Sequence, residues 1–401
     1  MIWAQIPFTD YMIMNVLMVF VLLAFFALII NGLRYLKSVK HPINHLPVGY
    51  SPPAAIIVPV AGCSPLIEQA LTSLLNLDYS DYELIFVTEC VEDPASAVVG
   101  RILKRHGNTS SRCQHIISGE STSCGQKNHN LLAGVAAASP ECEMLVFCDC
   151  THLAPVHWLK SLLQPLADKD IAVTSGYHRI IPADSRIATL GRTISVLILY
   201  CMQLIPRFAQ PWGGNMAMRK DTFDILNVRN VWGRNIVDDT SLAALLKKRR
   251  VGVTTVVDAE LATPLSGECV QGWIHWLIRQ WLYIKFCLPG TWIAAGVMFY
   301  ILTCALLWST ACCLAAVMGL IPPQAVLNFF LFLLLLACIC MVLRKCHLHY
   351  CPLPRWLGAC FVTVFVVSWC HLRTCFTREL RWSGKRYQVE QGGIVKNLFK
   401  E

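Results

Sequence analysis

The chain divides into three parts by its pattern of hydrophobic and polar positions. Residues 11–32 carry no charged side chain over roughly 20 positions, the length that a helix needs to cross a hydrocarbon core. Short apolar runs then alternate with segments of helical periodicity, and from residue 290 to 343 charged side chains are again absent. The pattern predicts an N-terminal transmembrane anchor (1–33), a polar domain (50–265) and C-terminal membrane segments (290–376).

The polar middle part predicts an α/β domain with a mainly parallel sheet. Strands are expected where the runs are short and apolar, at 54–60, 83–89, 113–119, 144–149, 171–177 and 252–258. Helices are expected between or after these strands, at 66–75, 128–138, 158–167 and 239–249. Strands this apolar are normally covered on both faces, which is typical of a doubly wound parallel sheet.

The last third predicts a helix at the membrane surface, followed by membrane segments. Residues 266–289 mix tryptophans with basic side chains, a composition suited to an interfacial helix. The next apolar stretch is interrupted by Pro322 and Pro323 and has room for two spans. Residues 356–370 are apolar but short for a full crossing. Because the tail (377–401) is basic, we expect it on the cytosolic side, with one apolar segment re-entrant or split.

Composition and charge support a membrane protein. The chain has 401 residues, of which 55% are hydrophobic and 15% are charged, too apolar for an ordinary soluble protein. Arg34, Lys37 and Lys40 follow the first apolar segment and predict a cytosolic middle domain. A cleaved signal peptide is the alternative for that segment, but Asp10 precedes it and the basic cluster follows it. The net charge of +9 indicates contact with anionic lipid headgroups, and no motif for nucleic acid is visible.

The 20 cysteines are scattered through polar and apolar stretches, without a CxxC repeat. We interpret them as reduced, small, moderately apolar side chains. The segment VFCDCTHLAP at 146–155 still leaves three interpretations of Asp149 open. It could belong to a thiol and imidazole metal site with His152, serve as a structural acid, or hold a cation for chemistry on a phosphate.

Acidic residues follow two of the predicted strands. Glu89, Glu92 and Asp93 come after one strand, and Asp149 comes after another. In parallel α/β sheets, ligands bind at the carboxyl ends of the strands, where loops converge. We therefore expect both groups at the same edge of the sheet.

A second pair of acids, Asp238 and Asp239, opens a predicted helix, where the helix dipole favours negative charge. One of them could simply cap the helix. Two adjacent carboxylates raise each other's pKa, however, which suits a general base. Gly213 and Gly214 precede this pair in WGGNMAMRKDTF and offer permissive backbone that a substrate could approach closely.

These motifs, in this order, resemble the membrane glycosyltransferases of the family 2 or 21 type, and within them the ceramide glucosyltransferase branch. The resemblance extends from about residue 55 to 393 and is specific as a set, although no single motif is. It rests on VPVAGCSPLIEQALTSLLNLDYSDYEL from 58, ECVEDPA from 89, GQKNHNL from 125, CDCTH from 148, GGNMAMRKD from 213, VDDTSLA from 237 and RWSGKRYQVEQGG from 381.

The resemblance implies a GT-A-like, Rossmann-like fold and transfer of glucose from UDP-glucose to the hydroxyl of ceramide, with inversion. Asp93 would contact the uridine half of the donor, Asp149 would help to hold Mg²⁺ or Mn²⁺ on the diphosphate, and Asp239 would be the base. The other implied site residues are Pro59, Lys127 and Arg279 on the donor side and Gly213, Gly214, Asp238, Trp276 and Trp281 on the acceptor side.

Two departures from the family pattern bear on these roles. Asp149 is followed by Cys150 and Thr151 and not by a second acid, so cation binding would depend on one carboxylate. The family's Arg-Trp element corresponds here to HWLIRQW, in which Arg279 fits but Trp281 comes one residue late. Trp276 occupies the first position of that element.

Several alternatives remain open from the sequence. They are a hopanoid or diacylglycerol glycosyltransferase with another UDP-hexose or an N-acetylhexosamine donor, a processive polysaccharide synthase, and a non-catalytic membrane scaffold or lipid carrier. A polysaccharide synthase needs a lined channel, for which about four spans are few. The expected location is the Golgi or endoplasmic reticulum in a eukaryote and the plasma membrane in a bacterium. The oligomeric state is left open.

Overall fold

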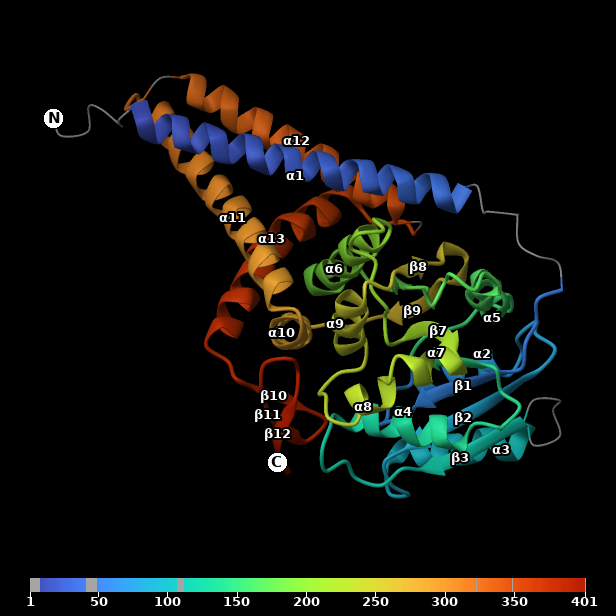
Figure 1. Ribbon diagram of the computed structural model, residues 1–401. Helices are drawn as coiled ribbons and strands as arrows, with labels where there is room; N and C mark the ends of the chain where they lie inside the picture. The colour runs from blue at the N-terminus through green and yellow to red at the C-terminus, as the bar shows by residue number, and fades with distance from the viewer. Residues whose placement is uncertain (1–7, 41–48, 107–111, 322, 348, 401) are drawn as a thin grey trace.

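The computed structural model describes residues 8–40, 49–106, 112–321, 323–347 and 349–400. A layered α/β unit lies beside a group of long apolar helices, and the C-terminal strands form a third, smaller part (Figure 1). The mixed α/β class with a mostly parallel sheet, predicted from the sequence, is confirmed.

The central sheet has seven strands in the order β3-β2-β1-β4-β7-β5-β8, and only β7 runs antiparallel to its neighbours. All six predicted strands form, with their ends displaced by at most a few residues. The sheet also contains β7, which was not predicted as a strand. The strands are β1 (Ala54–Pro59), β2 (Tyr82–Thr88), β3 (Arg112–Ile117), β4 (Met144–Cys148), β5 (Val173–Ser175), β7 (Asn215–Arg219) and β8 (Val253–Thr255).

Helices cover both faces of this sheet, because its central strands alternate apolar side chains to two separate cores. Ile56 and Val58 of β1 point to one core, and Ala55 and Ile57 point to the other. The first face is covered by α2 (Leu66–Leu74), α3 (Pro94–His106), α5 (Trp158–Leu163) and the 3₁₀ helix η1 (Gln164–Ala167). The second is covered by α4 (Gln126–Ala137), α7 (Lys220–Ile225), α8 (Val228–Trp232) and α9 (Asp239–Arg249).

A separate pair of parallel strands, β6 (His178–Pro182) and β9 (Leu261–Leu265), lies next to α6 (Ile187–Gln203). The 3₁₀ helix η2 (Val257–Ala259) precedes β9. The sequence analysis did not identify these strands or α6. Both strands are half-buried and lack a clear alternation, and β9 ends in Pro264 and Leu265, so a two-residue period is hard to recognise.

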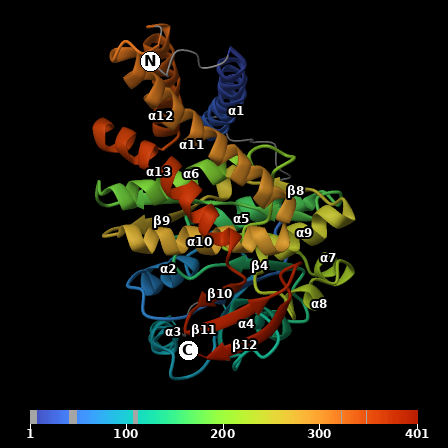
Figure 2. The same cartoon turned by 90° about the vertical axis from the view of Figure 1, so that its left-hand side faces the viewer.

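Four described helices are long and apolar enough to cross a membrane. They are α1 (Phe8–Lys40), α11 (Pro289–Val317), α12 (Gln324–Cys346) and α13 (Leu353–Cys375). The two spans expected on either side of the proline pair correspond to α11 and α12. In Figure 2, α6 and α10 (Val270–Cys287) run across the molecule at the base of α1, α11 and α12.

Two membrane elements are longer than the sequence pattern indicated. Helix α1 continues past the predicted end of the anchor to Lys40, because Tyr35 and Leu36 of its last turns pack into a core shared with α6 and α12. Helix α13 has 23 residues, or about 34 Å, which is long enough to span. It is also the most buried of the four, and it packs mainly on α6 and α10.

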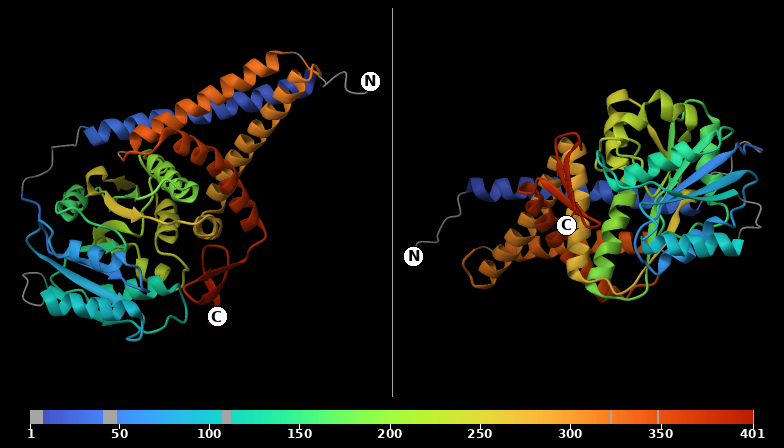
Figure 3. Two further views of the ribbon diagram at one scale, coloured as in Figure 1. Left: turned by 180° about the vertical axis from the view of Figure 1, so that it is seen from behind. Right: turned by 90° about the horizontal axis from the view of Figure 1, so that it is seen from below.

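The tail forms a three-stranded antiparallel sheet of β10 (Glu379–Trp382), β11 (Lys385–Val389) and β12 (Val395–Lys400). It packs against the start of α9 and the end of α10, and Figures 2 and 3 show it beside α4. An isolated bridge joins Ile394 to Asn235, three residues before Asp238. The tail therefore lies on the same side of the apolar helices as the α/β domain.

Candidate active site

Three sequence motifs meet at one lysine. Lys127 lies in the first turn of α4, Asp149 directly follows β4, and Asp238 directly precedes α9. The Lys127 Nζ lies 2.8 Å from Asp149 Oδ1 and 3.1 Å from Asp238 Oδ2. The structure thus brings together acids that are 89 positions apart in the chain, at the carboxyl end of the sheet.

The glycine pair allows the carboxylates to approach the backbone. A Cβ atom at Gly213 would lie 2.0 Å from Asp238 Oδ2, and one at Gly214 would lie 2.9 Å from Asp149 Oδ2. A larger residue at Gly213 would therefore displace Asp238, and one at Gly214 would first meet the Trp212 ring, at 2.6 Å. The close approach of substrate to these glycines stays a prediction, and the structure shows that protein carboxylates need the space beside them.

Asp239 has the environment of a general base. Its Oδ2 accepts a hydrogen bond from the Gly213 N–H at 3.2 Å, and its Oδ1 accepts one from the Thr240 N–H. Burial, with the neighbouring charge of Asp238, raises the pKa of Asp239 to about 7, although Lys127 opposes the shift. Near neutral pH this carboxyl can therefore both take up and release a proton.

Lys127 and Asp149 stay charged. Burial favours the neutral form of Asp149, but the Lys127 ammonium outweighs it and holds the pKa of Asp149 below its usual range. Burial likewise opposes the charge on Lys127, but Asp149 and Asp238 together hold the pKa of Lys127 above its usual value. A carboxylate that remains ionised can act as an oxygen ligand at any physiological pH.

Asp93 lies at the carboxyl end of β2, two strands away from Asp149 in the sheet. Its Oδ1 accepts hydrogen bonds from the Gly62 N–H at 2.9 Å and the Ala95 N–H at 2.8 Å. The carboxylate thereby fixes the loop after Pro59, the last residue of β1, against the start of α3. Asp93 and Pro59 border the same sheet edge as the lysine-linked acids.

The three α10 residues of the predicted site lie in different surroundings. The Arg279 guanidinium lies 5.9 Å from the ring centre of Trp382 in the tail. Arg192 of α6 lies 5.1 Å from the ring centre of Trp276. Trp281 is buried among α10, α11 and α13, with its ring against His371 and Phe299. The structure brings only Arg279 to the tail side of the site, and it places Trp281 in a helix core.

Tyr283 lies one turn further along α10 than Arg279. Burial raises the pKa of Tyr283, Arg279 opposes the shift, and Asp239 adds to it.

The site suits a hard cation better than a thiol-bound metal. All 20 cysteines are free, and burial raises the pKa of Cys148 and Cys150, so both thiols stay protonated. Among the described residues, no three His, Cys, Asp or Glu side chains gather as a metal site. Mg²⁺ needs only one or two protein carboxylates when substrate phosphates supply further oxygens, and the ionised Asp149 fits that requirement.

Sequence reasoning missed three residues around the site. Lys385 of β11 reaches Glu89 Oε1 at 2.6 Å and Gln126 Oε1 at 2.7 Å, next to Lys127. His178 and Thr263 lie beside His152. The signal for Lys385 was the basic run in the tail. The two β6–β9 residues had no sequence signal, since their strands were not recognised.

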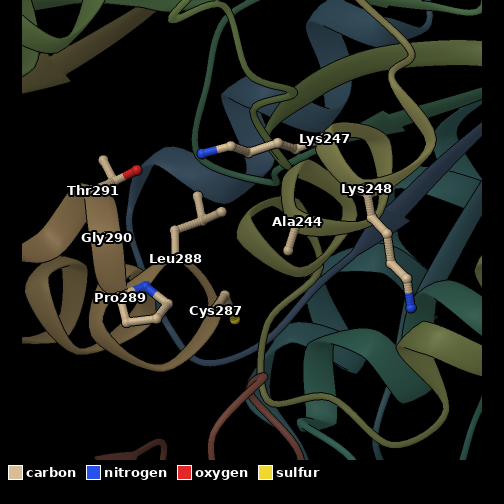
Figure 4. A pocket seen from close by; sticks show the side chains of 8 residues that line it. All are labelled: Ala244, Lys247, Lys248, Cys287, Leu288, Pro289, Gly290 and Thr291. Atoms are coloured by element: carbon tan, nitrogen blue, oxygen red, sulfur yellow. The ribbon is translucent and has the colours of Figure 1, made fainter.

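The cavity in Figure 4 lies away from these acids. It has a volume of about 310 Å³ and is lined by Ala244, Lys247, Lys248, Cys287, Leu288, Pro289, Gly290 and Thr291. It therefore borders the later turns of α9, where that helix meets the junction of α10 and α11. Asp239, at the first turn of α9, is not among its lining residues.

Four described helices fit an integral membrane protein, and the comparison with known families identifies a glycosyltransferase. The chain belongs to glycosyl transferase family 21, whose model matches residues 16–395. The resemblance to the ceramide glucosyltransferase family is thereby confirmed at the level of the family.

A solved structure with a similar fold is described as the mannosyltransferase PcManGT from Pyrobaculum calidifontis in complex with GDP-Man and Mn2+. It is 17% identical to this chain, with a TM-score of 0.56. The match covers 90% of this chain and 99% of the mannosyltransferase. At this identity the likeness shows the fold.

Proposed function

We propose that the protein is an inverting glycosyltransferase that transfers glucose from UDP-glucose to the hydroxyl of a membrane lipid. The lipid that we propose is ceramide. The observation that carries the proposal is the half-buried Asp239. Its pKa is near neutrality and it lies in a lysine-linked acid cluster beside helices that suit a bilayer. The family assignment supports the donor and acceptor classes.

In this proposal Asp239 takes the proton of the acceptor hydroxyl as the oxygen attacks the anomeric carbon. Attack from the face opposite to the leaving group gives inversion, and the pKa of Asp239 near 7 matches a base that works at neutral pH. Gly213 donates its N–H to the same carboxylate and so fixes the direction of its free lone pairs.

Charge builds up on the diphosphate as the sugar leaves. Lys127, between Asp149 and Asp238, is the nearest protein cation to the acids, and Arg279 adds a guanidinium suited to phosphate oxygens. A divalent cation supplies a further positive charge on the diphosphate when bound, and Asp149 would be its protein ligand. Asp93, after the end of β2 and two strands away from Asp149, would contact the uridine.

The acceptor would enter from the bilayer between α10 and the apolar helices. Helices α6, α10 and α13 pack together at the base of the spans. Only the headgroup of a lipid must reach Asp239, and its hydrocarbon chains can remain among apolar side chains. The catalytic domain would face the cytosol, in the Golgi or endoplasmic reticulum of a eukaryote or at the plasma membrane of a bacterium.

The test uses purified full-length protein in detergent, a panel of UDP-sugars and GDP-mannose, and ceramide, diacylglycerol and hopanoid acceptors, with and without chelator. The proposal expects transfer from UDP-glucose to ceramide that the chelator abolishes. Transfer only from another donor or to another lipid would replace the proposed substrates, and no turnover with any pair would favour a scaffold.

The base is tested by one substitution. Asp239→Asn should abolish transfer, which here means a loss of at least about 100-fold, while UDP binding stays nearly intact. The conservative amide preserves the size of the side chain but removes the proton acceptor. Equal loss of transfer and of UDP binding would show that Asp239 is not the base.

A further inference from the structure

The cavity in Figure 4 has no part in the reaction proposed above. Its volume of about 310 Å³ lies at the lower end of the usual range for a ligand pocket. One wall comes from the last turns of α9, and the other comes from the residues where α10 ends and α11 begins. The cavity therefore lies where the α/β domain meets the start of a candidate membrane span.

Two lysines give this cavity a positive charge. Lys247 and Lys248 of α9 line it, and none of the described lining residues is acidic. In Figure 4 the Lys247 ammonium points toward the wall to which Thr291 belongs. Both lysines are exposed, and within the described part of the chain neither ammonium has an ion-pair or hydrogen-bond partner. These charges can therefore bind an anion without first giving up a contact inside the protein.

The position of α9 accounts for only part of this charge. Four basic residues (247–250) follow one another at the end of the helix, where the helix dipole favours cations. Arg249 and Arg250 carry the same charge at the same helix end as the two lysines, but they do not line the cavity. The arginines therefore provide a matched comparison for the lysines.

The opposite wall of the cavity adds neutral hydrogen-bond donors. Helix α11 starts at Pro289 without a side-chain cap, and the Trp292 N–H donates to the Leu288 carbonyl at 3.0 Å. The N–H groups of Gly290 and Thr291 have no partner among the residues that the structure describes. Together with the two ammonium groups across the cavity, these donors suit the oxygens of a phosphate group.

The surface of α11 next to the cavity suits hydrocarbon chains. With 29 residues, α11 is about 43 Å long, enough to cross the hydrocarbon core and reach the headgroup layer. Gly290, Ile293 and Val297 are spaced by three and four residues and so lie on one face of the helix. Ile293 and Val297 are 55% and 50% exposed. An apolar face therefore leads from the cavity along the span.

We propose that this cavity binds the phosphate group of an anionic membrane lipid, whose acyl chains lie along the face of α11 that carries Ile293 and Val297. Lys247 and Lys248 pair with the phosphate, as basic clusters at the ends of membrane spans do with anionic headgroups. The site is separate from the one proposed for the lipid acceptor, because Asp239 is not among its lining residues.

Lipid selectivity is the first test, measured by native mass spectrometry of the purified full-length chain in neutral detergent, without UDP-sugar or ceramide. Phosphatidylglycerol should bind about tenfold more tightly than phosphatidylcholine, whose choline cation opposes the lysines, or diacylglycerol, which has no phosphate. Equal affinity for the three lipids would overturn the proposal. Because no sugar donor is present, this result does not depend on the proposed reaction.

Inorganic phosphate separates a lipid site from a site for a free anion. At the same concentration as phosphatidylglycerol, it should leave the amount of bound lipid unchanged, because it gains nothing from the apolar face of α11. Displacement of the lipid by inorganic phosphate would mean that the cavity takes a free anion, and the proposed occupant would be wrong.

Paired variants locate the binding in the cavity. Lys247→Gln with Lys248→Gln should weaken phosphatidylglycerol binding by about tenfold. Arg249→Gln with Arg250→Gln removes the same charge outside the cavity and should change the affinity by less than about twofold. Lys247→Arg with Lys248→Arg keeps the charge and should bind as wild type does. No loss in the lysine-to-glutamine variant, or an equal loss in both glutamine variants, would contradict a site in this cavity.

A second measurement shows whether each variant remains folded. All four substituted side chains are exposed, so the Tm of every variant in detergent should match that of wild type. Lipid affinities are therefore compared at equal Tm, and a tenfold loss confined to the lysine-to-glutamine variant at unchanged Tm supports the proposal.

Discussion

At the residue scale, the reactivity of Asp239 is set by its neighbours. Asp238 raises the pKa of Asp239, and Lys127 lowers it. Asp239 in turn raises the pKa of Tyr177, Tyr283 and Cys287. A base must be deprotonated to work, so kcat/KM should rise with pH and level off above about pH 7. Asp238→Asn removes the neighbouring negative charge and should move this acid limb to lower pH by about one unit.

The measurement for this prediction is the pH profile of kcat/KM for wild type and Asp238→Asn. The loss of the carboxylate that pairs with Lys127 should also reduce the plateau, since the lysine then has one partner fewer. A limb that stays in place while the plateau falls would mean that Asp238 does not control the pKa of Asp239.

The space beside Gly213 gives a second prediction. Gly213→Ala places a methyl group 2.0 Å from the carboxylate position of Asp238, so the acid must move. Activity should fall by about 100-fold, with UDP binding less affected. Gly252→Ala is the control, because its Cβ would meet no atom within 4 Å. Equal activity of the two alanine variants would show that the acid cluster tolerates displacement.

The acidic residues of the candidate site could be identified from the sequence, but their contacts with other residues could not. Asp93, Asp149 and Asp239 were identified from strand ends and a helix start, which are local signals, and from a family resemblance that depends on the order of the motifs. The pairing of Lys127 with both Asp149 and Asp238 depends on sheet order, which brings β4 and α9 together. His178 had no local signal, because a lone histidine in an unrecognised strand has no distinguishing pattern.

At the element scale, α10 serves mainly as a packing element. The Trp281 ring is buried against His371 and Phe299, and its Nε1 has no hydrogen-bond partner among the described residues. Trp281→Ala should therefore destabilise the protein by about 3 kcal/mol and lower its Tm. Trp281→Phe keeps an aromatic ring, loses no hydrogen bond and should lower Tm less than the alanine variant does.

Thermal scans in detergent and the KM for the lipid acceptor separate two roles of Trp281. Packing predicts that Tm falls in Trp281→Ala while the acceptor KM of the remaining folded enzyme is unchanged. A raised acceptor KM in Trp281→Phe, without loss of Tm, would instead assign the residue to the acceptor side.

The type of an element was predictable where its apolar run was long or where the strand is fully buried. The apolar strands β1, β2 and β4 and the helices α11 and α12 followed directly from the sequence. Strand β7 was read only as a glycine-containing motif, because its partners on both sides are antiparallel and distant in the chain. Tertiary pairing decides such strands, and no local propensity shows it.

At the scale of the whole molecule, the tail closes the chain onto its own catalytic domain. Helix α12 ends near the base of α6, and α13 then packs along α6 and α10 before the tail begins. The backbone joins the tail to the segment before Asp238, with hydrogen bonds from Ile236 N–H to the Gly393 carbonyl and from Val395 N–H to the Arg234 carbonyl. A tail across the membrane could not make these contacts.

Lys385 connects this tail to the donor side. It is 4% exposed and binds Glu89, four residues before Asp93, and Gln126, directly before Lys127. Lys385→Met keeps much of the side-chain volume but leaves Glu89 without its ammonium partner. Since Glu89 is partly exposed, the cost should be about 2 kcal/mol, below that of a fully buried pair.

The expected result for Lys385→Met is a several-fold higher KM for the nucleotide sugar with a nearly unchanged kcat, together with faster proteolysis of the tail. Lys400→Met is the matched control, because Lys400 also pairs with the tail-facing Glu120, at 2.7 Å, but is 72% exposed. Exposed pairs contribute little, so this variant should behave as wild type. If the two variants had the same donor KM, the tail would have no part in shaping the donor site, and its contacts would serve folding alone.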